Sequence, residues 1–560
     1  MLQWTLVFLL AVTLVSCLET VGPKHPPTHG QVWPKPQQET KEELYYTFDP
    51  SKFQVKVTGE NCTLLADAIE RYSYFVFKIL YDISERYRQE PSDVPNVILV
   101  RSISNDEDIT PPQENKHQGK LAVLEVDLTA SCEEYPYLGM DESYNLTVSA
   151  TSKITSASIW GILRGLESFA QLLYISDDFE VSEVRVNQTQ IVDYPRHTHR
   201  GLLLDTSRHF ISLNKIFTML DAMSMNKMNV FHWHIVDDQS FPYVSEKFPD
   251  LSGRGAYHRS MVYKKVDIQN VIEFARNRGI RVIPEFDVPG HTLSWGVAFP
   301  NILTQCYRGD KVIGLGPMNP IKNTTYKLIH ELFEEVQDLF PDKYFHVGGD
   351  EVELSCWSSN PELKDYMKEH KIGVSDLHSL FMRNIMPFFT NKSSPIVWEE
   401  VFTEGVPLTK ETLVHLWKGS TPSYAIALRQ GYRVLNSAGW YLSHLDKSFE
   451  EVYVIDPRQM VADITQNDTL AEGVVGGEAC MWAEMVDDNN LLSRVWPQAS
   501  AVAEALWSTP ARQPGRTWPY YGPAPVTETT LRRAEEHSCR MVRRGVPAQP
   551  LSGPGFCLAL

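Results

Sequence analysis

The 560-residue sequence lacks the cysteine and charge patterns that mark two large functional classes. It has no C-x-x-C pair, so neither a cysteine zinc site nor a thioredoxin-like motif is predicted. It has no basic excess either, because 52 Lys and Arg oppose 70 Asp and Glu, for a net charge of −18. We therefore expect no binding to nucleic acid or to anionic membranes.

The sequence also lacks a membrane-spanning apolar run, so no stable membrane anchor is expected. Residues 1–17 are apolar and end in small residues, which predicts a signal peptide. This stretch contains no Lys or Arg, and Leu14-Val15-Ser16-Cys17 also resembles a bacterial lipoprotein signal, which we rank second.

The cysteines and sequons fit an exported chain. With Cys17 removed, seven cysteines remain, and the odd number predicts one free thiol, for which Cys480 in an apolar strand-like run is the candidate. Sequence order suggests three disulfide bonds, Cys62–Cys132, Cys306–Cys356 and Cys539–Cys557. Six N-x-S/T sequons predict N-glycosylation at Asn61, Asn145, Asn187, Asn323, Asn391 and Asn467.

A chain of this length is expected to form more than one domain. Residues 18–40 are rich in Pro, Gln and His and predict a loose leading segment. Beyond them, residues 64–77 have a helical pattern, and residues 96–100 and 121–126 have strand patterns. None of these stretches has catalytic spacing, so residues 18–195 are interpreted as an α+β supporting domain.

After the break at residues 193–195, short apolar runs alternate with helical patterns at 213–223, 268–275 and 328–339. Eight runs are present: Gly201–Asp205, Asn229–Val236, Arg281–Phe286, Tyr344–Val347, Pro395–Glu399, Thr412–Leu416, Arg433–Asn436 and Gly473–Met481. Strands alternating with helices predict a parallel sheet, and eight units predict a (β/α)₈ TIM barrel. We expect this catalytic domain at 196–560, with a C-terminal helix and disulfide.

Such a barrel carries its chemistry at the C-terminal ends of its strands. The residues near these ends are Arg208, Asp237, His291, Asp350, Glu351, Trp398, Trp417, Tyr441, Trp482 and Glu484. Aromatic rings pack against the apolar faces of a pyranose, while Arg and carboxylates bind its hydroxyls. This set of residue types therefore predicts a sugar site.

The strongest local signal is the segment His346–Glu351, which reads HVGGDE. Gly348 and Gly349 let the backbone leave strand geometry, so that Asp350 and Glu351 can both face the barrel mouth. Crowding and partial burial raise the cost of ionising both acids, so one is expected to stay protonated and act as a general acid. The alternative is an acidic loop without a function.

Five segments carry a resemblance to a known family. They are Arg200–His209, Asn229–Asp238, Pro284–Gly296, His346–Glu351 and Gly476–Glu484. From about residue 41 to its C-terminus the chain resembles the family 20 glycoside hydrolases, and within them the animal lysosomal β-N-acetylhexosaminidases. The proposed cysteine pairing also looks like that of these enzymes.

The resemblance implies retaining, substrate-assisted hydrolysis of terminal β-linked N-acetylhexosamine, GlcNAc or GalNAc, without a metal or cofactor. The substrate's acetamido oxygen attacks C1, while Glu351 protonates the leaving oxygen and later activates water. The other implied roles are Asp350 and Tyr441 on the acetamido group, Trp398, Trp417 and Trp482 as pocket walls, Arg208 and Glu484 on ring hydroxyls, and Asp237 and His291 orienting Glu351. A homodimer or heterodimer, and a lysosomal or secreted destination, are also implied.

The chain departs from the family after Tyr441, where the loop at residues 443–447 is shorter and a carboxylate for the outer hydroxyls is absent or moved. The choice between GlcNAc and GalNAc therefore stays open. One hypothesis is that protonated His444 favours anionic sugars such as 6-sulfated GlcNAc. The alternative is a surface histidine in a shortened loop.

Two other functions compete with this one. His232 and His234 have the same-face spacing of a metal pair, but if Asp237 faces inward, strict alternation turns both histidines outward. A catalytically weakened sugar-binding protein is favoured only by the altered loop after Tyr441. Each proposed catalytic position holds a competent residue, which favours the enzyme.

Overall fold

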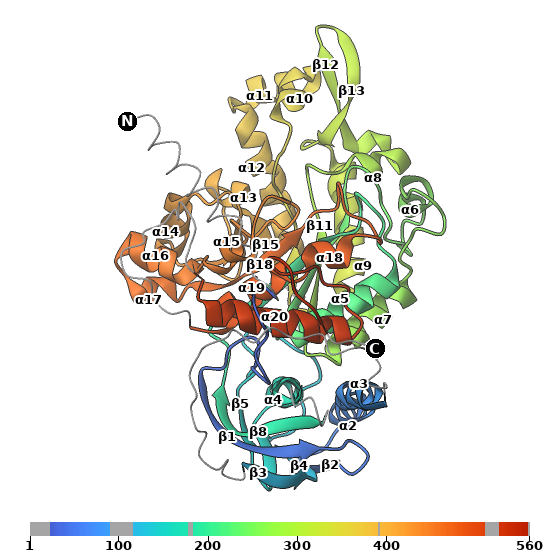
Figure 1. The fold of residues 1–560 in the computed structure, drawn as a ribbon. Coiled ribbons are helices and arrows are strands. Elements are labelled where there is room, and N and C mark those ends of the chain that lie inside the picture. The colour runs from blue at the N-terminus through green and yellow to red at the C-terminus, as the bar shows by residue number, and fades with distance from the viewer. Residues whose placement is uncertain (1–22, 90–115, 177–182, 390–391, 510–525, 558–560) are drawn as a thin grey trace, which may run out of the picture.

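A computed structural model describes residues 23–89, 116–176, 183–389, 392–509 and 526–557. These residues form a closed barrel with a smaller sheet domain beneath it (Figure 1). The predicted signal peptide, the predicted strand at 96–100 and the sequon at Asn391 lie outside the described residues.

Eight parallel strands close the barrel in the order β10-β11-β14-β15-β16-β17-β18-β9. Their bounds are β9 His199–Asp205, β10 Val230–Val236, β11 Arg281–Phe286, β14 Tyr344–His346, β15 Ser394–Trp398, β16 Leu413–Leu416, β17 Arg433–Asn436 and β18 Val474–Met481. Every predicted run is one of these strands, with bounds that differ by two residues at most. The predicted barrel is therefore confirmed.

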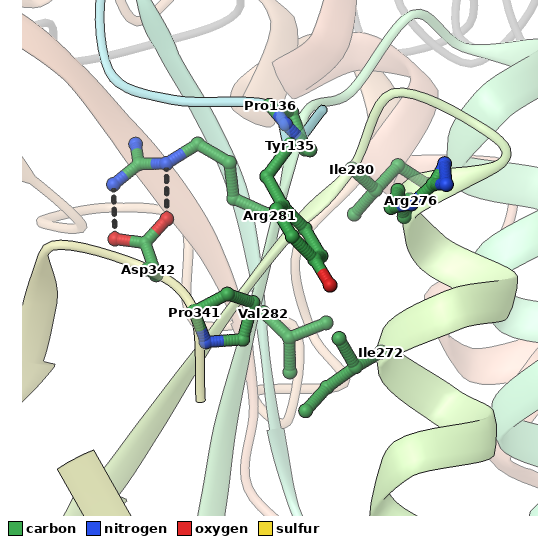
Figure 2. Close-up of a pocket in the computed structure, with 9 residues that line it drawn as sticks. All are labelled: Tyr135, Pro136, Ile272, Arg276, Ile280, Arg281, Val282, Pro341 and Asp342. Atoms are coloured by element: carbon green, nitrogen blue, oxygen red, sulfur yellow. Dashed lines mark hydrogen bonds and ion pairs between the residues drawn. The ribbon is translucent and has the colours of Figure 1, made fainter. Parts of the chain in front are cut away.

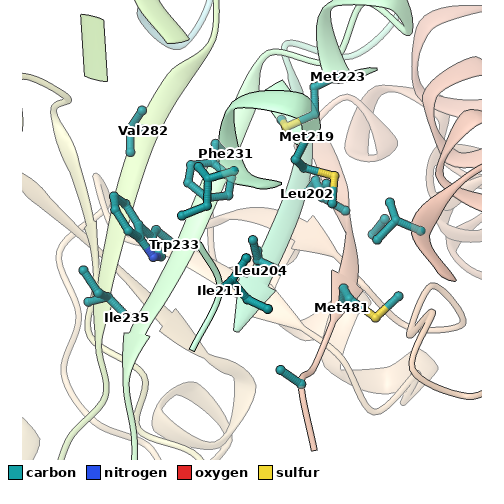
Figure 3. Packing of buried hydrophobic residues seen from close by; sticks show 14 of the residues in the cluster. Leu202, Leu204, Ile211, Met219, Met223, Phe231, Trp233, Ile235, Val282 and Met481 are labelled. Carbon is teal, nitrogen blue, oxygen red and sulfur yellow. The ribbon is translucent and has the colours of Figure 1, made fainter. Parts of the chain in front are cut away.

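Side-chain alternation divides each strand between two environments. Leu202 and Leu204 of β9 point outward and pack with Met219 and Met223 of α5 (Leu213–Met225), as Figure 3 shows. Leu203, between them, faces the barrel interior in a separate cluster. The other two predicted helices are also present, as α7 (Lys265–Arg276) and α9 (Asn323–Leu339).

The prediction that His232 and His234 face outward is wrong. Both side chains lie inside the barrel, where each contacts Glu285 of the neighbouring strand. The register between β10 and β11 shifts between His234 and Val236, so the chain gains a residue before Asp237. Because that bulge breaks the alternation, the two histidines and Asp237 share the inner face, while Val236 packs in the outer core.

The N-terminal sheet has the strand order β2-β4-β6-β5-β8-β1-β3, with β7 beside β8. Its strands are β1 Gln38–Phe48, β2 Gln54–Val57, β3 His117–Leu121, β4 Val123–Leu128, β5 Tyr144–Val148, β6 Ser152–Ser156, β7 Tyr174–Ile175 and β8 Val184–Asp193. The strand predicted at 121–126 is thus divided at Ala122. The helix predicted at 64–77 is α2 (Thr63–Arg71), a π-helical turn at Tyr72–Val76, and the start of α3 (Phe77–Gln89).

Helix α4 (Ile159–Leu172) joins the two domains, and all of its residues are buried. Arg164 of α4 and Arg200 of β9 both bind Glu142, at 2.9 and 2.5 Å, and the side chain of Asn229 donates to the same carboxylate at 3.1 Å. Glu142 is therefore a buried anion between two cations that come from different domains. The predicted domain boundary after residue 195 falls between β8 and β9.

A small cavity lies where Tyr135 and Pro136 of the N-terminal domain meet the barrel (Figure 2). Its volume is about 10 Å³, enough for about one water molecule. Tyr135 of the N-terminal domain lines it together with Arg281, which donates to Asp342 at 2.7 and 2.8 Å. It lies at the N-terminal end of β11 and is too small for a sugar.

The leading segment is ordered from residue 23 onward, contrary to the prediction of a loose one. Trp33 is fully buried and donates to the Ser500 carbonyl oxygen at 3.0 Å. The amide of Gly30 donates to Glu536 at 2.6 Å, on the C-terminal helix α20 (Glu528–Arg543). These partners are distant in sequence, so the segment's own composition did not reveal them.

The three predicted disulfide bonds are present, and Cys480 is buried and unpaired within the described chain. Cys306–Cys356 ties the hairpin β12 (Leu303–Arg308) and β13 (Lys311–Met318) to α10 (Leu354–Ser359). None of the helices in the described ranges is both long and apolar enough to cross a membrane.

Replacing Glu142 by Ala should lower the free energy of unfolding by about 3–5 kcal/mol, because Arg164 and Arg200 would remain as buried charges without their anion. Urea unfolding followed by fluorescence measures this. Glu134→Ala, at an exposed position nearby, should change the value by less than about 0.5 kcal/mol. Equal stability of the two variants would contradict a supporting role for Glu142.

Candidate active site

One cleft of about 340 Å³ opens at the C-terminal ends of the barrel strands. It is lined by Arg208, His234, Asp237, Asp287, His291, Asp350, Glu351, Trp417, Tyr441, Ser443, His444, Trp482 and Glu484. All the predicted site residues except Trp398 therefore line one cavity. Sequence reasoning missed His234, because of the bulge, and Asp287.

Trp398 lies one layer deeper than predicted. Its ring is buried 6.2 Å from the ring of Trp482, and its indole N–H donates to Glu285 at 2.8 Å. Trp417 and Tyr441 pack against the same cluster. Trp398 thus supports the floor of the cleft, while Trp417, Tyr441 and Trp482 form its aromatic surface.

The turn after β14 has the departure from strand geometry that its glycines predict. Gly348 and Gly349 have φ angles of +70° and +99°, and Glu351 follows at +50°. A Cβ atom on Gly348 would lie 1.8 Å from Oδ1 of Asp287, so no larger residue fits. The turn buries Asp350, which is 8% exposed, and leaves the Glu351 side chain 58% exposed.

The crowded carboxyl pair is not the one that the sequence suggests. Carboxyl oxygens of Asp350 and Asp287 lie within 4.8 Å of each other, whereas Oε2 of Glu351 lies 3.7 Å from Nε2 of His291. Burial and the neighbouring carboxylates Asp350 and Glu285 raise the pKa of Asp287 well above its usual range. Burial also raises the pKa of Asp350, although His291 opposes the shift. Asp287 lies in the segment Pro284–Gly296, which carries part of the family resemblance. No local sequence pattern, however, predicts that its side chain meets Asp350.

A row of charged side chains, which runs through Asp237 and His291, leads to Glu351. Asp237 forms an ion pair with Arg208 at 2.8 Å, accepts from His234 at 2.7 Å and contacts Nδ1 of His291 at 3.2 Å. Burial alone lowers the pKa of His291, but its bond to Asp237 and the charge of Asp350 outweigh it and raise the pKa to about 9. His291 is therefore a cation across the acidic range and faces Glu351.

Glu285, inside the barrel, is the buried end of this row of charges. It accepts from His234 at 2.7 Å and from Trp398 at 2.8 Å, and it forms an ion pair with Nε2 of His232 at 2.9 Å. Burial lowers the pKa of His234, but the carboxylates on both sides raise it to about 10. His346, His234 and His232 in turn hold the pKa of Glu285 well below its usual range, against the effect of burial.

Three buried histidines, His232, His346 and His415, have ring nitrogens within 4.8 Å of one another. Both nitrogens of His232 already face carboxylates, Glu478 at 2.7 Å and Glu285 at 2.9 Å. Together these raise the pKa of His232 to about 9, despite burial. A protonated His232 has no lone pair for a metal, so this cluster does not favour metal binding.

The comparisons with known proteins agree along the chain. Residues 197–510 match the model described as glycosyl hydrolase family 20, catalytic domain, and residues 32–172 match one described as beta-acetyl hexosaminidase like. Beta-hexosaminidase subunit alpha of Bos taurus is 39% identical over 544 residues, which are 94% of each chain. Beta-hexosaminidase subunit beta of Homo sapiens is 39% identical over 526 residues, 92% of this chain and 86% of that one.

The fold has matching relatives as well. A chitobiase structure from Flavobacterium johnsoniae superposes with a TM-score of 0.73 at 30% identity, covering 92% of this chain and 73% of that chain. The catalytic-domain match spans more than half of the sequence and contains every strand of the barrel. The chain therefore belongs to glycosyl hydrolase family 20.

Proposed function

We propose that the chain removes terminal β-linked N-acetylhexosamine from glycoconjugates with retention of configuration, the substrate's own acetamido group acting as the nucleophile. One observation carries the proposal. Oδ1 of Asp350 is buried and has no hydrogen-bond partner among the described residues, in a cleft that also holds Glu351 and Tyr441. A buried acceptor of this kind requires a donor, and an acetamido N–H provides one.

In the first step, Glu351 gives its proton to the leaving oxygen as the acetamido oxygen attacks C1. His291, held as a cation by Asp237, lies 3.7 Å from Glu351 and stabilises the carboxylate that this step creates. Because the nucleophile belongs to the substrate, most of its positioning entropy is lost on binding rather than at the transition state. Glu351 then removes a proton from the water that opens the cyclic intermediate.

The other cleft residues hold the sugar. Asp350 accepts the acetamido N–H and stabilises its positive charge, while the hydroxyl of Tyr441 donates to the acetamido oxygen. The ring of Trp417 is inclined by 25° to that of Tyr441, with centroids 5.9 Å apart, and with Trp482 it encloses the methyl group. Arg208 and the exposed Glu484 bind ring hydroxyls at the rim.

The chain is further proposed to work in the lysosome or outside the cell. Three disulfide bonds are typical of proteins that fold in an oxidising compartment. The dimer implied by the family resemblance stays a prediction, as does the choice between GlcNAc and GalNAc.

Replacing Glu351 by Gln should lower kcat by about 10²–10⁴-fold, because an amide cannot donate the proton. Release of a chromogenic phenol from its N-acetyl-β-glucosaminide measures this. Glu353→Gln removes a carboxylate from the same turn, outside the cleft lining, and should leave the rate unchanged. If wild type and Glu351→Gln were equally inactive, a sugar-binding protein would be the better description.

Replacing His444 by Ala tests the hypothesis of an anionic substrate. His444 is exposed in the cleft, so an imidazolium at this position should gain about 0.2–1 kcal/mol with a sulfate group, up to about fivefold. The ratio of 6-sulfated to neutral substrate hydrolysed at acidic pH should fall by that factor in the variant. An unchanged ratio means that His444 is a surface residue without a role.

N-glycans should be found at the four exposed sequons, Asn61, Asn145, Asn323 and Asn467. Asn187 should carry none, because its amide donates to the Glu42 carbonyl at 2.7 Å and accepts from Tyr174 at 2.7 Å. Protein from a eukaryotic secretory host is treated with an amidase that converts glycosylated Asn to Asp. Mass spectrometry then compares the masses of its peptides with those of an untreated sample. Conversion of Asn187 to Asp, whatever happens at the other four sites, would refute this assignment.

A further inference from the structure

Asp287 is a cleft residue to which the mechanism above gives no task. It follows β11 directly and is 1% exposed, although it lines the cleft. Its Oδ1 accepts from the amide of Gly349 at 2.8 Å. Its Oδ2 lies 3.9 Å from Nε2 of His291, and its remaining contact is the side chain of Asp350.

The turn after β14 is built around this carboxyl group. Gly348 has no Cβ because Oδ1 of Asp287 occupies that space, 1.8 Å from where a Cβ atom would lie. The amide of Gly349 fixes Oδ1 of Asp287, and the same carboxyl group has an oxygen within 4.8 Å of a carboxyl oxygen of Asp350. Two buried carboxyl groups in contact cannot both be ionised without a large cost, so a single proton between them is the stable arrangement.

We propose that Asp287 is a positioning residue that holds this proton and donates it in a hydrogen bond to Asp350, which orients the Asp350 carboxylate toward the acetamido group. Asp350 is then the anion of the pair, and one of its oxygens is occupied from behind. The other oxygen is left for the substrate. This inference rests on the proposed role of Asp350 in binding the acetamido N–H.

The surroundings of the two acids favour that placement of the proton. Asp350 is 8% exposed, and its Oδ2 lies 3.9 Å from Nε2 of the His291 cation, so its charge is compensated. Asp287 is more deeply buried and lies near the Glu285 anion, which disfavours a second negative charge there. The pKa of Asp287 is accordingly raised well above its usual range by burial and by Asp350 and Glu285.

The opposite arrangement places the charge on Asp287, as the partner of His291, and the proton on Asp350. The two arrangements differ in what an amide does at position 287. In Asp287→Asn the amide oxygen can accept from Gly349 and the amide nitrogen can donate to Asp350, which reproduces a protonated Asp287 in size and bonding. If Asp287 were the anion, the same change would remove a charge that the site needs.

The experiment compares Asp287→Asn and Asp287→Ala with wild type on the chromogenic N-acetyl-β-glucosaminide. Asp287→Asn should keep kcat within about threefold of wild type. Asp287→Ala should lower kcat about 10²-fold, because Asp350 loses its orientation at the reacting group. Asp446→Asn, which removes one charge at an exposed position beside the cleft, is the matched control and should behave as wild type. Melting temperatures are recorded for all variants.

The Asn variant decides the question even if the Ala variant does not fold. A loss of about 10²-fold in kcat with an unchanged melting temperature would overturn the proposal. So would a fully active Asp287→Ala.

A failure of the proposed function itself would give a different result, namely a wild type that releases no phenol. In that case the same proteins are titrated with N-acetylglucosamine by tryptophan fluorescence, since Trp417 and Trp482 line the cleft. Asp287→Asn should bind as wild type does and Asp287→Ala about tenfold more weakly, the loss of one charge-assisted hydrogen bond. Equal binding by both variants, or weak binding by Asp287→Asn, would again overturn the positioning role.

Discussion

One buried carboxylate, Glu285, sets the arrangement of the barrel interior. A negative charge without exposure to water has to be met by donors on several sides, and Glu285 meets them from strands β10 and β15 at distances of 2.7–2.9 Å. Since these donors are His232, His234 and Trp398, the same charge fixes the ionised histidines and the floor of the cleft. The sugar site is therefore continuous with the barrel core.

This continuity explains how an exposed glutamate can have a defined electrostatic environment. Glu351 is more than half exposed, yet the cation next to it, His291, is held by Asp237, which is held by His234 and Arg208. Charges alternate in sign along this path from Glu285 outward, so each member stabilises the next. The carboxyl groups of Asp287 and Asp350 lie beside this path. Each is 3.9 Å from Nε2 of His291, whose positive charge compensates the negative charge of the pair.

The barrel and the rim were predictable because they depend on local patterns. Eight apolar runs gave eight strands, and reading the residues beyond each run collected nearly the whole cleft. The errors came from interactions that span the fold. A single bulge at the end of β10 reversed the direction of two histidines, and a contact between the turns after β11 and β14 made Asp287 the partner of Asp350 in place of Glu351. Trp33 lies in a segment that the sequence predicts to be loose, because its partner Ser500 is 467 residues away and no local pattern reveals it.

The leading segment packs against the C-terminal helix α20, and this contact affects the order in which the protein folds during synthesis. Gly30 and Glu536, which join these parts, are separated by 506 residues. At roughly 5–20 residues per second, a ribosome needs about 25–100 s to deliver the second after the first. Throughout that interval the leading segment, with its large indole ring at Trp33, lacks its permanent cover and is exposed to chaperones and to other nascent chains. The N-terminal domain is thus translated early but completed late.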